Sequence, residues 1–350
     1  MNDIKDKICD FDELYKSMYK CKKNVMWKDS VAGYVKNGLV NCYKLHHQLL
    51  DGSYKIDNYS YFTIYEPKTR DIVSTRMKDR VFQRSMCDNY LYERMTKSLI
   101  YDNAACQTDK GTDFAMDRLN CHLQRYFRIN GSNGFVLQCD ISNYFGSTTH
   151  RVAKQVATNR IDDEWVLGQV FNIIESFGSK DNPDIGMGLG SQVTQLMQLA
   201  VLDDLDHFIK EELKIKQYIR YMDDFILIHK DKEHLQHCKD LIEEKLFIIN
   251  LKLNKKKTQI YPISRGIKFL GFRFMLTSAG KVIRKLNKEN ISHERRKLKK
   301  LKCLVDKGIL TRKDVNECFT AWKAHAKKGN THNLIIRMDK YYKELWKDGV

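Results

Sequence analysis

The spacing of hydrophobic and polar residues divides the chain into helical and strand-like segments. Apolar positions at helical spacing predict helices within residues 1–50, 78–99, 111–128, 149–177, 193–213, 232–247 and 291–307. Thr112 is a candidate N-cap, and Gly308 a candidate C-terminal stop. Alternating or short continuous apolar runs predict strands within 57–76, 134–140, 217–228, 257–263 and 267–275. We therefore expect an α+β fold that ends in a helical region.

Two of the predicted strands carry carboxylates at their ends. The 217–228 run, QYIRYMDDFILI, places Asp223 and Asp224 inside an apolar segment, and the 134–140 run ends at Asp140. Buried carboxylates are costly unless they are paired or hold a metal. Mg²⁺ prefers oxygen ligands, and two such ions can serve one in-line phosphoryl displacement. The sequence therefore predicts a metal site at one sheet edge, although a polar hairpin turn is the simpler alternative for Asp223-Asp224.

The net charge of the chain indicates a polyanionic binding partner. The 350 residues have a net charge of +17, and residues 281–350 contribute 20 Lys/Arg against 8 Asp/Glu, or +12. The first 280 residues contribute 41 against 36, only +5. Charge gathered at one end favours nucleic-acid binding over a merely solubilising surface. Ten cysteines without zinc-ligand spacing, and no secretory signal or membrane span, predict reduced, mostly buried thiols in a cytoplasmic protein.

The acidic motifs resemble those of reverse transcriptases. Tyr221-Met222-Asp223-Asp224 is similar to their YxDD signature, and residues 139–145 (CDISNYF) resemble their first aspartate motif. The resemblance runs in order over residues 60–345. It implies a right-hand polymerase with fingers, palm and thumb that synthesises DNA on an RNA template. It also implies that Asp140, Ile141, Asp223 and Asp224 form the metal site, with two Mg²⁺ ions (or Mn²⁺) as cofactors.

The resemblance suggests a division of the chain into domains. Residues 1–50 would be an N-terminal helical extension and 51–135 the fingers. Residues 136–280 would be the palm, with a fingers insertion at about 151–183. A small basic helical thumb would follow at 281–350, gripping the template–primer duplex through its phosphates.

Further motifs of the family match at expected places. Residues 66–72 resemble the fingers hairpin that clasps the triphosphate, so Lys68 and Arg70 would contact the incoming dNTP. Phe145 matches the bulky residue that rejects a ribose 2′-hydroxyl, and Lys257 the lysine that protonates the leaving pyrophosphate. The simpler alternatives are a solvated hairpin tip, a core phenylalanine and a basic face.

Two other stretches match in the same way. Residues 269–273 resemble the primer-grip hairpin, formed by Phe269, Leu270 and Gly271. Residues 78–83 (KDRVFQ) match a segment that supports structure and contacts template.

The glycine-rich loop at 184–192 points to a subgroup. Leu189-Gly190 followed by Thr194-Gln195 is similar to the pattern of reverse transcriptases from diversity-generating retroelements, which are related to group II intron-like and defence-associated enzymes. Leucine in place of a family glutamine removes a polar check on the new base pair, so we expect low fidelity. An antiphage-defence enzyme that copies a dedicated noncoding RNA is the alternative.

Rival functions from other classes are a viral-type RNA polymerase and a non-catalytic RNA-binding scaffold. Phe145 argues against the first and the retained acids against the second. The expected partners are template RNA, an RNA–DNA duplex and dNTPs, with a structured noncoding RNA and an accessory protein as additional candidates and no membrane.

Overall fold

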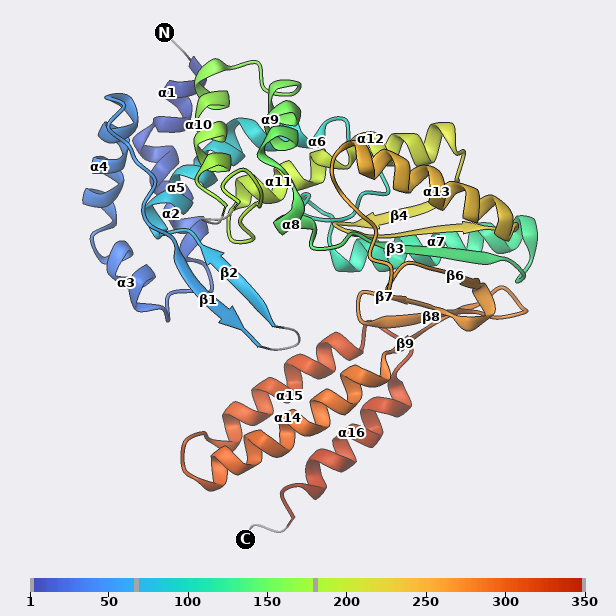
Figure 1. Ribbon diagram of the computed structural model, residues 1–350. Helices are drawn as coiled ribbons and strands as arrows, with labels where there is room; N and C mark the ends of the chain where they lie inside the picture. The colour runs from blue at the N-terminus through green and yellow to red at the C-terminus, as the bar shows by residue number, and fades with distance from the viewer. Residues whose placement is uncertain (1–2, 66–68, 179–181, 348–350) are drawn as a thin grey trace.

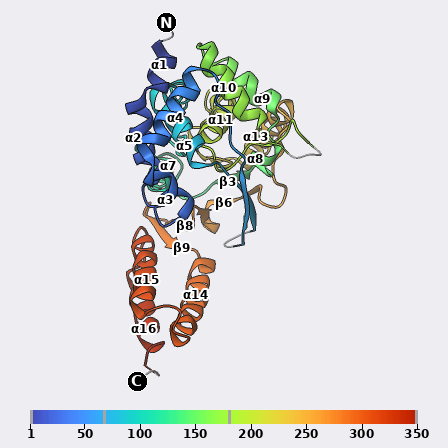
Figure 2. The ribbon, with the colours of Figure 1, turned by 90° about the vertical axis from the view of Figure 1, so that its left-hand side faces the viewer.

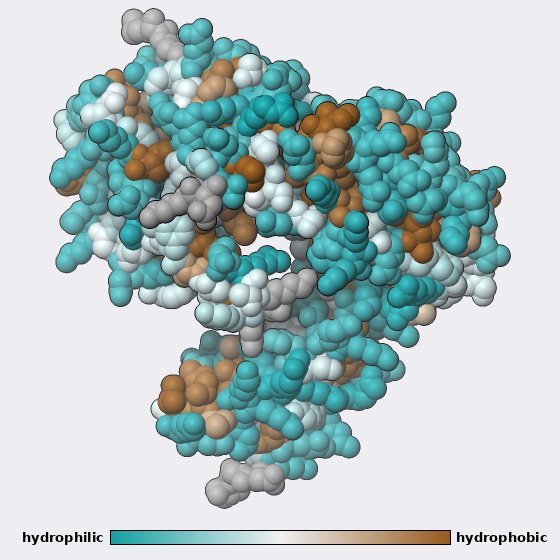
Figure 3. Space-filling view, viewed as in Figure 1, coloured by the Kyte–Doolittle hydropathy of each residue, from teal (hydrophilic) through white to brown (hydrophobic). Residues whose placement is uncertain are grey.

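The computed structural model describes residues 3–65, 69–178 and 182–347. The chain forms three lobes (Figure 1). An N-terminal lobe of helices carries a β-hairpin, a central lobe is built on an antiparallel sheet, and a C-terminal lobe contains three helices. Figure 3 shows an opening between these lobes.

The N-terminal lobe contains the helices predicted within 1–50, 78–99 and 149–177, and the predicted hairpin. The 78–99 segment is one helical run with a π-helical turn in the middle. The hairpin strands pair in antiparallel register, with Ile64 opposite Arg70. The elements are α1 (Asp3–Cys9), α2 (Phe11–Lys22), α3 (Asp29–Lys36), α4 (Gly38–Leu50), β1 (Ser60–Ile64), β2 (Arg70–Ser74), α5 (Met77–Met86), η1 (Cys87–Leu91), α6 (Tyr92–Thr96), α9 (His150–Thr158) and α10 (Glu164–Glu175).

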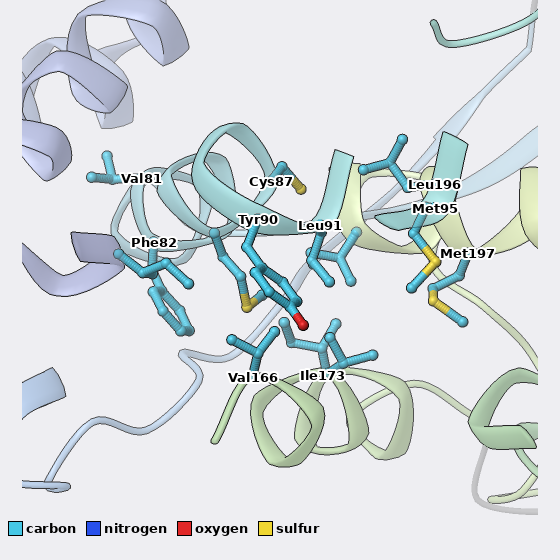
Figure 4. Close-up of a cluster of buried hydrophobic side chains, with 14 of the residues drawn as sticks. Val81, Phe82, Cys87, Tyr90, Leu91, Met95, Val166, Ile173, Leu196 and Met197 are labelled. Atoms are coloured by element: carbon cyan, nitrogen blue, oxygen red, sulfur yellow. The ribbon is translucent and has the colours of Figure 1, made fainter. Parts of the chain in front are cut away.

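A single buried cluster holds this lobe together and reaches the next one. Phe82 of α5 and Leu91 of η1 lie in it with Ile173 of α10 (Figure 4). Leu196 of α11 (Gln192–Val201) belongs to the same cluster. Because α11 directly follows the glycine-rich loop, this packing holds the end of that loop against the N-terminal lobe.

The central sheet has the strand order β4-β5-β3-β6, with all neighbours antiparallel. Helices cover both of its faces (Figure 1). Leu137 and Leu227 pack on the side of α13, whereas Val136 and Ile226 pack on the side of α7. Burial on both faces explains why these strands are continuous apolar runs. The elements are α7 (Thr112–Asn130), β3 (Phe135–Asp140), α8 (Tyr144–Ser147), α12 (Asp203–His207), η2 (Phe208–Glu212), β4 (Gln217–Tyr221), β5 (Asp224–His229), α13 (Lys232–Ile248) and β6 (Gln259–Pro262).

A second, three-stranded sheet joins the central lobe to the C-terminal helices. Its order is β7-β8-β9, again antiparallel. The three helices share a small core around Leu298, Phe319 and Met338. The elements are η3 (Ile263–Arg265), β7 (Ile267–Phe269), β8 (Phe272–Leu276), β9 (Val282–Leu286), α14 (Lys288–Asp306), α15 (Arg312–Ala326) and α16 (His332–Glu344).

The strand predictions near the C-terminus were partly wrong. Residues 267–275 form two strands, because Leu270 and Gly271 have φ angles of 46° and 86° and make a two-residue hairpin turn. The 257–263 strand is shorter than predicted, since residues 255–257 form a turn and β6 begins at Gln259. The expected all-helical 281–350 region begins with β9, which pairs with β8.

Two helix predictions also need correction. The 193–213 helix is interrupted at Leu202, whose φ and ψ of −101° and 10° leave the helical region. Thr112 is the first residue of α7 rather than its cap, a position that Gly111 occupies.

All ten cysteines are unpaired thiols, but only five are buried, and Cys106 and Cys303 are exposed. The expectation of mostly buried thiols therefore holds for half of them. Among the described helices, none combines the length and apolarity that a membrane span requires.

Candidate active site

The three aspartates meet at one end of the central sheet. Asp140 ends β3 and is the register partner of Asp224, the first residue of β5. The backbone N–H of Ile141 donates to the carbonyl of Asp223 at 3.1 Å. Met222 and Asp223 form the two-residue turn between β4 and β5, since Tyr221 pairs with Asp224. Residues separated by more than eighty positions in the sequence are thus neighbours.

Burial and the repulsion between neighbouring carboxylates disfavour the ionised forms of Asp223 and Asp224. Burial raises the pKa of Asp224 to about 7, and the charges of Asp140 and Asp223 add to the increase, while the Gln138 amide opposes it. Burial likewise raises the pKa of Asp223, which Lys257 and Arg70 partly offset. Like-charged carboxylates in a shared site are relieved by a bound cation.

The donor set fits a divalent cation that takes oxygen ligands. Asp140, Asp223 and Asp224 are the side chains that would hold it, and the Ile141 carbonyl is the predicted backbone ligand. In the part of the chain that the structure describes, no three acidic, His or Cys side chains are already arranged as a metal site. Lys257 forms an ion pair with Oδ2 of Asp140. A cation that uses this same oxygen would displace the ammonium group.

A buried ion pair supports the turn from below. Arg220 and Asp206 are both fully shielded from solvent, and the Arg220 Nε donates to Asp206 Oδ1 at 2.7 Å. Tyr218 donates its hydroxyl proton to the same carboxylate at 2.6 Å. The Arg220 Nη1 donates to the carbonyl of Met222 at 3.1 Å. Met222 has a φ of 56°, a strained value for a side chain of this kind, so this contact helps to hold the turn.

Neither Arg220 nor Asp206 has a role that the sequence motifs indicate. The available signal was a charged residue inside an apolar strand, two positions before the turn. Its acidic partner lies fourteen residues earlier, in a helical run with several acids, so nothing in the pattern singled it out.

The fingers hairpin lies close to the glycine-rich loop. A Cβ on Gly190 would stand 2.3 Å from the carbonyl oxygen of Val73 in β2, so only glycine permits this approach. Half-buried Leu189 accepts a hydrogen bond from the Gln195 amide at 3.2 Å. Arg70 is exposed at the start of β2, and its charge acts on Asp223. Lys68 lies outside the described residues.

Phe145 is placed by the same loop. It belongs to α8, just beyond Asp140, and its carbonyl accepts a hydrogen bond from the Met187 N–H at 2.7 Å. Its ring is partly buried between the N-terminal and central cores. This position is compatible with both the gate and the core role.

Gln138 links the predicted primer-grip hairpin to Asp224. The Gln138 amide donates to the carbonyl of Lys268 at 2.9 Å and to Asp224 Oδ1 at 3.4 Å. At the hairpin tip, the Gly271 carbonyl accepts from the Asn287 N–H at 3.1 Å. Phe269 is buried below the tip, and Leu270 packs partly against the same core. Gln138 is a third residue that sequence reasoning missed, because its partners come from distant segments.

Comparison with known proteins decides the family. A family model described as "Reverse transcriptase (RNA-dependent DNA polymerase)" matches residues 67–274, more than half of the chain. The chain belongs to the reverse transcriptase family. Members of this family generally use divalent metal ions and bind template nucleic acid.

Individual relatives of this reverse transcriptase are distant. Protein YkfC of Escherichia coli (strain K12) is 22% identical over 258 residues, which cover 61% of the chain and 66% of that protein. The chain thus spans about two thirds of YkfC.

Two telomerase structures share its fold. That of apo telomerase from Candida tropicalis, truncated from the C-terminal domain, has a TM-score of 0.50, 14% identity and coverage of 65% of this chain and 55% of that one. That of telomerase from Candida albicans with the TWJ fragment of telomeric RNA has a TM-score of 0.50, 10% identity and coverage of 76% and 55%. The chain spans about half of each telomerase chain. This likeness confirms the expected α+β right-hand polymerase fold.

The buried pair under the turn generates a stability prediction. Replacing Arg220 by Met leaves the Asp206 charge buried without its partner, so we expect a loss of about 3–5 kcal/mol in the free energy of unfolding, measured in urea. The triple variant Arg220→Met, Asp206→Leu, Tyr218→Phe removes the polar groups together and should regain most of this loss. A single variant that loses less than about 1 kcal/mol would contradict a buried, ionised pair.

The raised pKa of Asp224 generates a prediction for metal binding. A proton on this carboxyl competes with the metal, so affinity for Mn²⁺ should rise about tenfold between pH 6 and pH 8. Calorimetry on the protein without nucleic acid would measure this rise. Asp224→Asn should flatten the dependence, and equal wild-type affinity at both pH values would count against the assignment.

Proposed function

We propose that the protein is an RNA-directed DNA polymerase, which synthesises cDNA by nucleotidyl transfer with two divalent metal ions, Mg²⁺ in the first instance. The observation that supports it best is the meeting of Asp140 with Asp223 and Asp224, through the Ile141–Asp223 backbone bond, in a chain of the reverse transcriptase family. Its substrates are dNTPs and an RNA template with a primer, and its place of action is the cytoplasm.

The carboxylates carry the chemical role in this proposal. Bound metal would make the primer 3′-hydroxyl a better nucleophile and neutralise charge on the departing pyrophosphate. Asp140 and Asp223 would hold the cations, and Asp224 would support them from the start of β5. Lys257, which pairs with Asp140 in this structure, is released towards the pyrophosphate oxygen, where it donates a proton.

In this proposal, residues from all three lobes position the dNTP, the primer end and the duplex. Arg70, with Lys68, binds the triphosphate from the fingers side, which agrees with the effect of the Arg70 charge on Asp223. Phe145 excludes the ribose 2′-hydroxyl from its place beside Met187. Phe269, Leu270 and Gly271 hold the primer end, since Gln138 links their hairpin to Asp224. The basic C-terminal lobe follows the duplex through its phosphates.

Primer extension tests this proposal. On an RNA template the wild-type protein should incorporate dNTPs with Mg²⁺, and neither NTPs nor EDTA-treated reactions should yield product. Asp223→Asn should reduce synthesis more than about 100-fold. The change removes a carboxylate that would hold the metal ion at the transferring phosphate. The unfolding midpoint of this variant should not fall, since the lost charge is a desolvated one.

Asp204→Asn is the matched control, as Asp204 is an exposed acid of α12 away from the turn. It should retain full synthesis. Substantial activity in Asp223→Asn, or equal use of NTPs, would contradict the proposal.

We further propose that the enzyme copies with low fidelity, as in a diversity-generating retroelement. Leu189 supports this, because an aliphatic side chain beside Gly190 offers the new base pair only apolar contact. A structured noncoding RNA and an accessory protein would then complete the active complex.

Leu189→Gln tests the fidelity proposal. One added hydrogen bond should lower misincorporation at template adenines by roughly two- to tenfold, measured by sequencing the cDNA. Leu189→Met, which stays apolar, should leave the error frequency as it is. An unchanged error frequency in Leu189→Gln would remove Leu189 as the cause.

A further inference from the structure

Gln138 is a half-buried polar residue within an otherwise apolar part of the central sheet. Side chains alternate along β3, so Val136, Gln138 and Asp140 share one face of this sheet. On that face Val136 packs in the core on the side of α7. A polar group at such a position needs hydrogen-bond partners, because a missing partner costs free energy. The partners of Gln138 therefore explain why a polar residue is tolerated here.

Both ends of the Gln138 amide are hydrogen-bonded. The amide nitrogen carries two hydrogens, and it donates to the Lys268 carbonyl at 2.9 Å and to Asp224 Oδ1 at 3.4 Å. The amide oxygen accepts from the hydroxyl of Tyr261 at 2.9 Å. Tyr261 is 8% exposed and lies on β6, opposite Val136 in the register. Three segments that are distant in the sequence thus meet at one amide group.

The Tyr261 hydroxyl and its surroundings restrict this amide to one orientation. Exchanging the amide oxygen and nitrogen would direct the oxygen at the Lys268 carbonyl and the Asp224 carboxylate, which are both acceptors. Two hydrogen bonds would then be lost and replaced by repulsive contacts. In the observed orientation the Tyr261 hydroxyl bonds the amide oxygen, and the nitrogen faces Asp224. Tyr261 therefore acts on Asp224 through Gln138.

The same amide anchors the β7–β8 hairpin, since Lys268 lies on β7. The hairpin tip is held from its other side. There the Gly271 carbonyl accepts from the backbone N–H of Asn287 at 3.1 Å and from the side-chain amide of Asn290 at 3.4 Å. Asn290 belongs to α14, the first helix of the C-terminal lobe. Figure 2, like Figure 1, shows the second sheet between the central lobe and the C-terminal helices.

We propose that Gln138 and Tyr261 are positioning residues of the metal site. Gln138 fixes the Asp224 carboxylate and its spacing from the hairpin, and Tyr261 keeps the Gln138 amide in the orientation that does so. Outer-shell groups of this kind hold a ligating carboxylate in its binding geometry, and they thereby raise the affinity for the metal. This inference rests on the proposed function, to which it adds two residues outside the short polymerase motifs.

Calorimetry with Mn²⁺, on the full chain without nucleic acid, tests the inference. Gln138→Met keeps the approximate size of the side chain but removes its hydrogen bonds, and it should weaken Mn²⁺ binding about tenfold. Tyr261→Phe removes only the hydroxyl that orients the amide, and it should weaken binding about threefold. The double variant should bind no more weakly than Gln138→Met alone, because Tyr261 acts through Gln138.

Tyr126→Phe is the matched control. Tyr126 is a buried tyrosine of α7, and its hydroxyl donates to the Asn133 carbonyl at 2.7 Å, near the end of β3 opposite to Asp140. The loss of this hydrogen bond should lower the unfolding midpoint in urea about as much as Tyr261→Phe does. Mn²⁺ affinity should stay at the wild-type value. The comparison separates a loss of stability from a loss of positioning.

Primer extension gives a second reading. Tyr261→Phe should raise the Mg²⁺ concentration for half-maximal synthesis and recover the wild-type rate at saturating Mg²⁺, which a partly unfolded protein would not do. Gln138→Met should stay slow at saturating Mg²⁺, because the Lys268 carbonyl has lost its donor and the hairpin is no longer fixed. Duplex affinity, measured by fluorescence anisotropy, should be unchanged in both variants.

Wild-type Mn²⁺ affinity in either single variant would overturn the inference, as would additive losses in the double variant. If Gln138→Met does not fold, Tyr261→Phe alone decides, since it removes a single oxygen atom. A wild-type chain that synthesises no DNA, but whose Mn²⁺ affinity depends on Gln138 and Tyr261, would refute the proposed function and retain the positioning role.

Discussion

Arg220 and Asp206 form an ion pair inside the protein, and the geometry of the Met222-Asp223 turn depends on it. The pair lies beneath Met222, whose backbone adopts a strained left-handed conformation. The guanidinium group that neutralises the buried Asp206 charge also bonds the Met222 carbonyl. The same side chain therefore stabilises the strained conformation of Met222. Asp223 and Asp224 are thereby presented to Asp140 on a rigid support.

The candidate active site lies where the N-terminal lobe, the central lobe and the β7–β8 hairpin meet. Gly190 allows β2 of the N-terminal lobe to touch the loop that precedes α11, and Gln138 joins the β7–β8 hairpin to Asp224. In the proposed polymerase these two contacts would relate nucleotide, metal and primer to one another. A displacement of β2 or of the β7–β8 hairpin would therefore alter the surroundings of the three aspartates.

Acidic and basic side chains are concentrated in different parts of the chain. The carboxylates repel each other and attract cations, while lysines and arginines dominate residues 281–350.

The sequence by itself determined the α+β class, the reverse transcriptase family and the strands that end at Asp140 and Asp223, because periodicity and short motifs are local properties. The apolar pattern alone predicted one strand over residues 267–275, and only the resemblance to the primer-grip hairpin indicated a turn at Leu270-Gly271, because positive φ values are not visible in an apolar run. The sequence could not pair Arg220 with Asp206, Gln138 with Lys268, or Lys257 with Asp140. Such partners are chosen by which segments the folded sheets and helices bring together, and only the tertiary structure decides that.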